Sequence, residues 1–348
     1  MVARLELGGA QLSLLRVTRE LARRGHRTRL LAGTATPAGV ELARAHGVDP
    51  QVMGSGAELQ WECAADFAAW LAPRLEDAEV VHAHMLGAWW AAAEASPPGV
   101  PLVASEHNGY SRLDGMPWGA MADVASRIDR FYAHSPDARA GALRVGIPEG
   151  RIRLGVSPVE GMHAPPRGDL PSPRIVYAGR FSRDKGPDVL LDAVARMTAP
   201  PPVLMLGAGE LEPELRAQAA RSGLEETVRF CGWVPEPARW VAGASVQACP
   251  SRHEAFSQTA VLAMGLGVPV VGTDVDGFPD TLAGGRGLVV APEDPAALAR
   301  ALEDVLGGRR RTDTAAARAW ARGFATSRVT DLYERGYEQL LAPVGFAK

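Results

Sequence analysis

Two kinds of hydrophobic pattern alternate along the first 165 residues of the chain. Short runs of consecutive apolar residues are typical of strands buried on both faces of a parallel sheet. Between them lie segments in which apolar residues recur every third or fourth position, as on one face of a helix. The strands are expected near 26–33, 78–84, 100–108 and 128–136, with helices at 11–25, 40–47, 63–75, 87–95 and 136–146.

The same alternation begins again after a passage rich in proline and glycine at 162–173, which has the composition of a linker. Repeated strand–helix units predict the α/β class, with two doubly wound, Rossmann-like domains. The domains are expected over 1–165 and 170–326, with a last amphipathic stretch in 327–348 packing back on the first. Ligands of such sheets bind at the carboxyl ends of the strands, so the two domains are expected to face each other across a cleft.

An uncharged run extends from Glu254 to Asp274. It is either a membrane segment, a buried helix and strand, or a helix that carries one acid to a ligand. A spanning helix needs roughly 20 mainly apolar residues, and this run is broken by the sequence GLGVP. We therefore expect a helix over 257–266, a turn at Gly267 and a buried strand over 268–273, with no transmembrane segment.

The first strand is expected to be short. The opening MVARLELGG leaves room only for the end of a strand, near Val2 to Arg4. A first strand is normally central in such a sheet, so its loss would leave neighbouring backbone groups unpaired. The expectation is that the natural chain begins several residues upstream of Met1.

Composition narrows the functional classes. Of the 348 residues, 47% are hydrophobic and 22% charged, which is typical of a globular protein with a core. A net charge of −3 argues against nonspecific binding of nucleic acid. Cys63, Cys231 and Cys249 are odd in number and widely spaced, which argues against disulfides or structural zinc and favours the cytoplasm. No signal peptide is expected.

A first candidate for ligand chemistry is GRFSRDKG, at 179–186. An expected strand ends at Gly179, Arg180 and Lys185 follow, and a helix is expected to start near Pro187. Two cations beside a helix N-terminus suit a diphosphate, through charge-assisted hydrogen bonds and the helix dipole. The alternative is a solvated basic turn.

A second candidate is SRHEAFSQTA, in which Glu254 precedes a helix whose first turn is 257–259. The acid could accept hydrogen bonds from sugar hydroxyls while the first-turn N–H groups face an anion. Alternatively, the acid merely favours the helix dipole. In a weaker third candidate, Gly8 and Gly9 precede a helix, where they either form a plain turn or let backbone approach a ligand.

Histidines form a fourth candidate. His82 and His84 alternate at a strand end, so they point to the same side of the sheet. With His107 they could suggest a metal, yet no further ligand at zinc spacing is evident. The alternatives are a polar histidine in a cleft and a histidine packed in the core.

Together these motifs carry a family resemblance. CPSRHEAFSQTAVLAMGLGVPVVGTDVDGFPD is similar to the pattern P-S-x-x-E-G-F-G…E-A-M-A-x-G-x-P-V-V…G-G-x-P-E of retaining GT-B glycosyltransferases of the GT4 type. YAGRFSRDKGPDVLLDA and LGAGELEPEL resemble the preceding segments of that family, and LELGGAQLSLL and VVHAHMLG match weaker ones. The resemblance covers nearly the whole chain, and it rests on the order and spacing of the motifs.

The resemblance implies roles for these residues. Arg180 and Lys185 would hold the donor diphosphate, Glu254 would contact hydroxyls of the sugar, and His84 would lie near the reacting sugar. The donor site would be completed by Gly8, Gly9, Gly207, Gly232, Trp233, Val234, Ala255, Phe256, Ser257, Gln258, Thr259 and Leu262. The family transfers sugar with retention and without a metal, so no metal or cofactor is expected; the nucleotide sugar is a substrate.

Two departures from the family pattern stand out. The family has a second Glu eight positions after the first, where it grips the ribose diol, and this chain has Leu262 there. Either the donor carries 2-deoxyribose, as a dTDP-sugar does, or donor binding has decayed and the protein is a noncatalytic partner. Ser157-Pro158 replaces Asn-Gly near the linker, which is expected to alter the hinge and leave the chemistry unchanged.

The sequence thus predicts a metal-independent retaining glycosyltransferase. It would move a sugar from a nucleoside diphosphate to a hydroxyl of a small or lipid-linked acceptor, in antibiotic or cell-envelope glycan biosynthesis. The acceptor is expected to meet Trp89, Glu106, His107 and Tyr110, although Trp89 and its neighbour Trp90 could equally be buried. Residues 21–29 are only a modest basic cluster, which leaves peripheral membrane contact open. A sugar-nucleotide 2-epimerase is the alternative enzyme.

Overall fold

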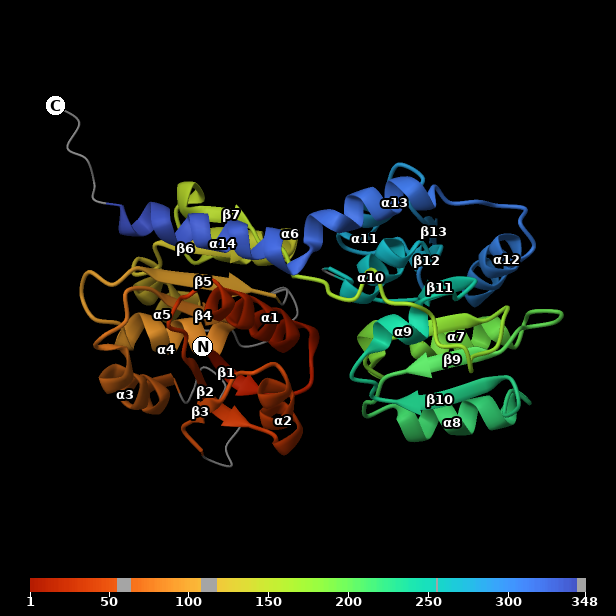
Figure 1. Ribbon diagram of the computed structural model, residues 1–348, viewed down its shortest axis with the longest axis horizontal. Coiled ribbons are helices and arrows are strands. Elements are labelled where there is room, and N and C mark those ends of the chain that lie inside the picture. Colours follow the sequence, from red (N-terminus) through yellow and green to blue (C-terminus); the bar gives the residue numbers. More distant parts are fainter. Residues whose placement is uncertain (55–63, 108–117, 255, 343–348) are drawn as a thin grey trace. The chain divides into compact units, whose positions relative to one another are not determined.

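The computed structural model describes residues 1–54, 64–107, 118–254 and 256–342 (Figure 1). The chain forms two units: Met1–Pro158 together with the segment that begins at Thr326, and Val159–Ala325. Each unit contains one parallel sheet with helices on both faces, which confirms the predicted fold class. The proline-rich passage at 162–173 falls within the second unit, and Met162 is buried in that unit's core.

The first unit is built on a seven-stranded sheet of order β3-β2-β1-β4-β5-β6-β7. Its strands are β1 (Val2–Leu5), β2 (Leu30–Ala35), β3 (Pro50–Val52), β4 (Val81–His84), β5 (Leu102–Glu106), β6 (Arg130–Ala133) and β7 (Ile152–Leu154). The short β1 is central, as expected, and pairs with β4 through Val2 and His84. The edge strands β3 and β7 were not predicted, since neither has a long apolar run.

Helices cover both faces of this sheet. They are α1 (Gly9–Arg23), α2 (Pro37–Ala45), α3 (Ala64–Leu75), α4 (Leu86–Ala95), α5 (Trp118–Ala125), α6 (Pro136–Arg144) and α14 (Thr326–Leu341). One apolar cluster joins the sheet to α3, α4, α5 and α6, and two others join its opposite face to α1, α2 and α14. Alternate strand residues therefore face different helical layers, which accounts for the nearly continuous apolar strands.

The C-terminal helix α14 docks on the first unit, beside β6 and α1 (Figure 1). Val329 and Tyr333 are buried against Val17, Val103 and Tyr132. Arg24, the C-cap residue of α1, donates to Glu334 and pairs with Asp331, which fixes the polar edge of α14. Packing of one apolar stripe against the sheet and α1 is what brings this distant segment of the chain back to the first unit.

The second unit has a six-stranded sheet of order β10-β9-β8-β11-β12-β13. The strands are β8 (Ile175–Ala178), β9 (Val203–Leu206), β10 (Val228–Gly232), β11 (Val246–Cys249), β12 (Val270–Thr273) and β13 (Leu288–Val290). One face is covered by α7 (Pro187–Val194), α8 (Glu212–Arg221) and α12 (Pro295–Leu306). The other is covered by α9 (Pro237–Val241), α10 (Gln258–Leu266), α11 (Phe278–Leu282) and α13 (Thr314–Ala321).

The uncharged run after Glu254 is the predicted helix and strand. Helix α10 ends at Gly267, which has a φ of 73°, and β12 follows at Val270. Both elements are buried, so their lack of charge reflects the core of the second unit. Among the described helices, none has the length and apolar character that crossing a membrane requires.

Candidate functional site

The central strands of the second sheet diverge between β8 and β11. The chain runs outward from β8 through β9 to β10 on one side, and from β11 through β12 to β13 on the other. Adjacent loops that leave in opposite directions open a crevice at the carboxyl edge of a parallel sheet, where ligands bind. The two loops at this point hold 179–186 and 250–257, the segments that contain the two strongest motifs of the sequence.

The loop after β8 places one cation at the second loop and leaves the other exposed. Lys185 is half-buried, and its ammonium lies 3.1 Å from Oε2 of Glu254. Arg180 has 60% of its side chain exposed and reaches only Asp184, at 3.5 Å. The hydroxyl of Tyr177 donates to the carbonyl of Arg180 over 2.6 Å, which holds the backbone of this turn. Only Lys185 of the two predicted cations therefore meets Glu254.

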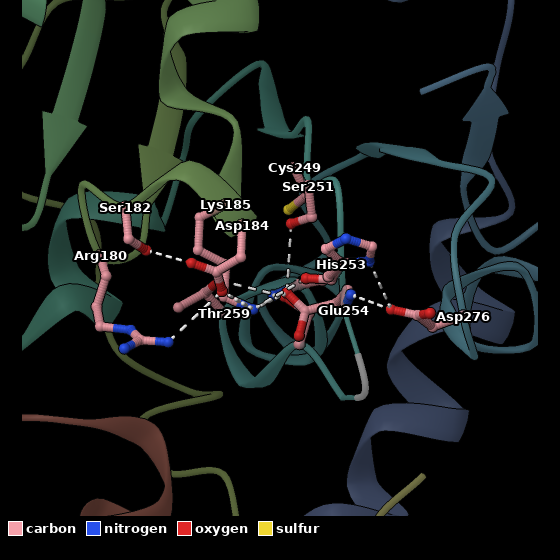
Figure 2. A network of polar contacts seen from close by, with 12 residues as sticks. Arg180, Ser182, Asp184, Lys185, Cys249, Ser251, His253, Glu254, Thr259 and Asp276 are labelled. Carbon is pink, nitrogen blue, oxygen red and sulfur yellow. Dashed lines mark hydrogen bonds and ion pairs between the residues drawn. The ribbon is translucent and has the colours of Figure 1, made fainter. Parts of the chain in front are cut away.

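Glu254 is 7% exposed and is held from several directions (Figure 2). Besides Lys185, the hydroxyl of Ser251 lies 3.4 Å from its carboxylate. Its backbone N–H donates to Asp276 over 2.8 Å, and Asp276 adopts a φ of 48°, which is unusual for a residue with a side chain. Figure 2 shows Lys185 on one side of Glu254 and Asp276 on the other.

Asp184 adds a further carboxylate beside Lys185, 3.7 Å from the ammonium. Partial burial works to raise the pKa of Asp184, but a hydrogen bond from Ser182 and the charges of Lys185 and Arg180 lower it below its ordinary value. Lys185 is thus shared between two carboxylates in this structure.

The first turn of α10 faces the same crevice. The hydroxyl of Ser257 caps this helix by accepting the N–H of Ala260. Thr259 donates from its hydroxyl to the carbonyl of Ala178 over 2.9 Å, which ties the turn to the end of β8. Behind it, burial raises the pKa of the Cys249 thiol to about 12, so this group stays neutral at physiological pH. The helix end is therefore fixed next to Lys185 and Glu254.

The other predicted donor residues lie on neighbouring loops. A side chain at Gly207, where φ is 148°, would collide with the carbonyl of Gly179, so glycine is required for the two loops to pack. The N–H of Gly207 donates to the carbonyl of Gly232. The next residue, Trp233, is 36% exposed. Val234, Phe256 and Gln258 are half-buried, and Ala255 lies outside the described residues.

Leu262 lies one helical turn deeper than the first turn of α10. It is 4% exposed and belongs to an apolar cluster with Val159, Met162 and Ala238. A carboxylate at this position would need a polar partner, whereas the leucine completes the core. The position that the family pattern gives to an acid is thus part of the packing between α10 and its neighbours.

The first unit has its own point of divergence, between β1 and β4. Gly8 precedes α1 in an extended conformation and Gly9 begins the helix, so neither has the left-handed backbone that demands glycine. His84 is the last residue of β4 and is 3% exposed. The three candidates therefore lie at the carboxyl edge of this sheet.

His84 belongs to a cluster of imidazoles in which His84 and His134 are buried and His82 and His107 are half-buried. Its Nδ1 lies 3.2 Å from Nε2 of His107, and its ring stacks on His82 with centroids 4.2 Å apart. His107 in turn lies against His134, at 3.9 Å between centroids. Two tyrosines of α14 close the cluster, Tyr337 at 2.6 Å from His82 and Tyr333 at 3.4 Å from His134. No metal-binding group of His, Cys, Asp and Glu occurs among the described residues.

The expected acceptor residues are less accessible than the sequence suggested. Trp89 is fully buried, packs edge-on against Phe131 and directs its indole N–H toward Glu106, which is also fully buried. Neither side chain presents a surface that an acceptor could contact, because α4 packs directly on the sheet. Trp90 is half-buried and donates to Glu94. Tyr110 lies outside the described residues.

Several residues of these networks were not singled out in the sequence. Arg252, His253 and Asp276 belong to the motif that carries the family resemblance, yet only the fold shows that they contact the loop of Lys185 or Glu254. Tyr333 and Tyr337 contact histidines that precede them by 199 and 255 residues in the sequence. No local pattern marks such a contact.

Comparison with known proteins identifies the family. The description "Glycosyltransferase Family 4" matches residues 7–154, and "Glycosyl transferases group 1" matches 172–307. A D-inositol 3-phosphate glycosyltransferase from Nocardioides sp. is 32% identical over 75% of this chain and 68% of its own. Two Rossmann-like units, each built on a parallel sheet and carrying these motifs, define a GT-B protein. The chain belongs to the family 4 (group 1) glycosyltransferases.

The alignments with the curated relatives are partial. D-inositol 3-phosphate glycosyltransferases from three Streptomyces species are each 32% identical over 68% of this chain, and the chain spans 54–62% of their lengths.

Solved structures share the fold over the whole chain. Anabaena Alr3699/HepE in complex with UDP has a TM-score of 0.78 and 19% identity, with 97% of this chain and 98% of that chain covered. Sucrose-phosphate synthase from Thermosynechococcus elongatus has a TM-score of 0.76 and 21% identity, with 98% and 96% covered.

Gly186 tests the contact between the two loops of the second unit. It has a φ of 59°, and a Cβ atom there would lie 2.1 Å from the carbonyl oxygen of Pro250. Gly223→Ala is the matched control, since Gly223 has a φ of 67° and open space around it. The control is expected to lose about 1–2 kcal/mol of unfolding free energy from backbone strain. Gly186→Ala is expected to lose about 1–3 kcal/mol more from the collision. Equal losses in urea denaturation would contradict this packing.

The histidine cluster predicts acid sensitivity. Burial lowers the pKa of His107 to about 4, and it lowers the pKa values of His82, His84 and His134 well below 6.5. The unfolded chain therefore binds more protons than the fold below about pH 6.5, so stability is full above that pH and falls toward pH 4. Each extra proton changes the unfolding free energy by about 1.4 kcal/mol per pH unit.

His107→Gln is expected to reduce the slope of unfolding free energy against pH by up to one proton between pH 6.5 and 4. Urea denaturation at several pH values measures this slope. His163→Gln is the control, because His163 is exposed on the second unit and lies outside the histidine cluster. An unchanged slope in His107→Gln would contradict this, because it would mean that His107 binds protons equally in the folded and the unfolded chain.

Proposed function

We propose that this protein is a retaining glycosyltransferase that moves a sugar from a nucleoside diphosphate to a hydroxyl group. The observation that carries the proposal is the pair formed by Lys185 and Glu254 at the point where β8 and β11 diverge, beside the first turn of α10. Family membership supports the same activity. A cation, a helix N-terminus and a buried acid together suit a diphosphate linked to a polyhydroxylated group.

In this proposal, Lys185 and the amides of α10 bind the diphosphate, and the exposed Arg180 turns toward it. The carboxylate of Glu254 gives up its ion pair with Lys185 and accepts hydrogen bonds from hydroxyls of the sugar. Gly232, Trp233 and Val234 contact the nucleobase at the end of β10. Solved structures of the same fold support this donor class, since Alr3699/HepE contains UDP in one crystal and UDP-glucose in another.

The proposed reaction needs no paired carboxylates. The bond between the anomeric carbon and the diphosphate oxygen breaks as the acceptor oxygen attacks from the same face. The departing diphosphate takes the proton of the acceptor hydroxyl. The protein's part is to stabilise negative charge on the leaving group, which Lys185, Arg180 and helix N–H groups can provide without a metal.

The acceptor class follows from weaker observations. His84 and His107 lie at the carboxyl edge of the first sheet, where one neutral imidazole could hydrogen-bond a sugar or acceptor hydroxyl. The relatives are named D-inositol 3-phosphate glycosyltransferases, which act on a small polyhydroxylated molecule. Inositol 3-phosphate therefore belongs in an acceptor panel with other small hydroxyl compounds and lipid-linked sugars.

A donor screen tests the proposal. Thermal shift is measured with nucleoside diphosphates and then with their sugars, and binding at about a hundred times Kd should add about 2.7 kcal/mol of stability. Transfer to the acceptor panel is then measured with the bound donor. Glu254→Gln is expected to lower transfer ten- to hundredfold, because a charged hydrogen bond contributes about 1.5–3 kcal/mol.

The same variant provides an internal control. Glu254→Gln should bind the free nucleoside diphosphate at least as tightly as the native protein, because Lys185 loses a competing carboxylate. Transfer that is unaffected by Glu254→Gln would argue against this role. Release of free sugar or an epimer without an acceptor would favour an epimerase of the same fold.

Leu262 raises two alternatives, a donor that contains 2-deoxyribose and a homologue that has lost donor binding. A buried leucine where the family has a ribose-binding acid favours a 2-deoxyribose donor. We therefore expect dTDP to bind more tightly than UDP in a calorimetric titration. The matched probe is dUDP, which differs from UDP only in the 2′-hydroxyl and should share the preference. Tighter binding of UDP would contradict the deoxyribose donor. Binding of none of the three would instead favour a noncatalytic homologue that acts as a partner protein.

A further inference from the structure

Arg252 uses every donor of its guanidinium within the second unit. Nη1 donates to Asp188 at 2.7 Å and to the carbonyl of Arg183 at 3.0 Å. Nη2 donates to Asp188 at 2.7 Å and to Glu293 at 3.1 Å, and Nε also donates to Glu293. A guanidinium has five N–H groups, so none remains for a ligand unless one of these bonds breaks.

These partners come from two segments at the same edge of the sheet, and Arg252 itself lies on a third. Arg183 and Asp188 flank Lys185 in the segment from β8 into α7. Glu293 lies between β13 and α12, where it adopts a φ of 56°. Arg252 itself lies between β11 and α10, two residues before Glu254. One side chain, 13% exposed, therefore joins the loops that follow β8, β11 and β13.

Backbone contacts connect this residue to the segment that carries Lys185. The N–H groups of Arg252 and His253 both donate to the carbonyl of Asp184, at 2.8 and 3.1 Å. Lys185 is the residue after this carbonyl, and Glu254 is the residue after His253. The two residues of the Lys185–Glu254 pair are thus each adjacent to a residue that takes part in these hydrogen bonds.

We propose that Arg252 is a positioning residue, which sets the distance between Lys185 and Glu254 by clamping the loops that carry them. The proposal rests on the proposed function for the role of that pair. The planar fork is essential to the clamp, because an ammonium in its place is a point charge that cannot engage Asp188 and Glu293 in this geometry. Arg252 acts through Lys185 and Glu254, and it does not touch the donor itself.

Arg252→Lys tests the clamp, because it keeps the charge and removes the fork. The probe is whichever of UDP or dTDP binds the native protein more tightly, titrated by calorimetry well below the unfolding temperature. We expect Kd to rise about tenfold. Asp188→Asn removes the bidentate partner and should raise Kd in the same direction. Arg309→Lys is the matched control, since Arg309 forms an exposed pair with Asp304 in the same unit, and its Kd should be unchanged.

A double-mutant cycle distinguishes positioning from direct contact. In a Lys185→Ala background, Arg252→Lys should raise Kd by no more than about twofold, because the group it positions is gone. A full tenfold rise in both backgrounds would mean that Arg252 contacts the phosphates, which overturns the proposal. If Arg252→Lys and Asp188→Asn lower stability but leave Kd unchanged, Arg252 stabilises the fold without positioning the Lys185–Glu254 pair. That result would also overturn the proposal.

Hydrogen exchange separates this inference from the proposed function. The amide of His253 should exchange about tenfold faster in Arg252→Lys than in the native protein, whether or not a nucleotide binds. Native protein that binds neither UDP nor dTDP would contradict the proposed function, while the exchange measurement would still test the clamp. Unchanged exchange at His253 would overturn the clamp even if the nucleotide binds.

Discussion

The packing of two loops against each other at the carboxyl edge of the second sheet is the contact on which the candidate site depends. At Gly186 the carbonyl of Pro250 leaves no room for a side chain, and the carbonyl of Asp184 accepts two N–H groups from the opposite loop. This contact brings Lys185 within 3.1 Å of Glu254, although 68 residues of sequence separate them. Without it, the cation and the acid would lie on two loops that do not contact each other.

Each of the two cations at this site, Lys185 and Arg252, lies near two carboxylates. Lys185 lies near Asp184 and Glu254, while Arg252 is fully engaged by Asp188 and Glu293. These two cations therefore have different tasks. The ammonium of Lys185 can change partners when an anion arrives, because a point charge on a flexible stem needs no fixed geometry. The fork of Arg252 holds its geometry, and it keeps the loops in place while the partners of Lys185 change.

The first unit places a different chemistry at the corresponding edge of its sheet. Neutral, stacked imidazoles surround His84, and α14 covers them with two tyrosines. Burial lowers the pKa values of these histidines, so the cluster offers hydrogen bonds and carries no charge near neutral pH. The chain thus has a charged edge on the sheet of its second unit and a neutral polar edge on the sheet of its first.

The sequence by itself determined the alternation of buried strands and helices, the two α/β units and the loops that carry Arg180, Lys185 and Glu254. These features follow from local periodicity and from glycines that end helices, which need no knowledge of distant contacts. Only the tertiary structure decided that Lys185 meets Glu254 while Arg180 remains exposed, that Trp89 and Leu262 are core residues, and that Arg252 joins three loops. Each of these depends on which loops the sheet order brings together, and strand order is a long-range property that no local pattern records.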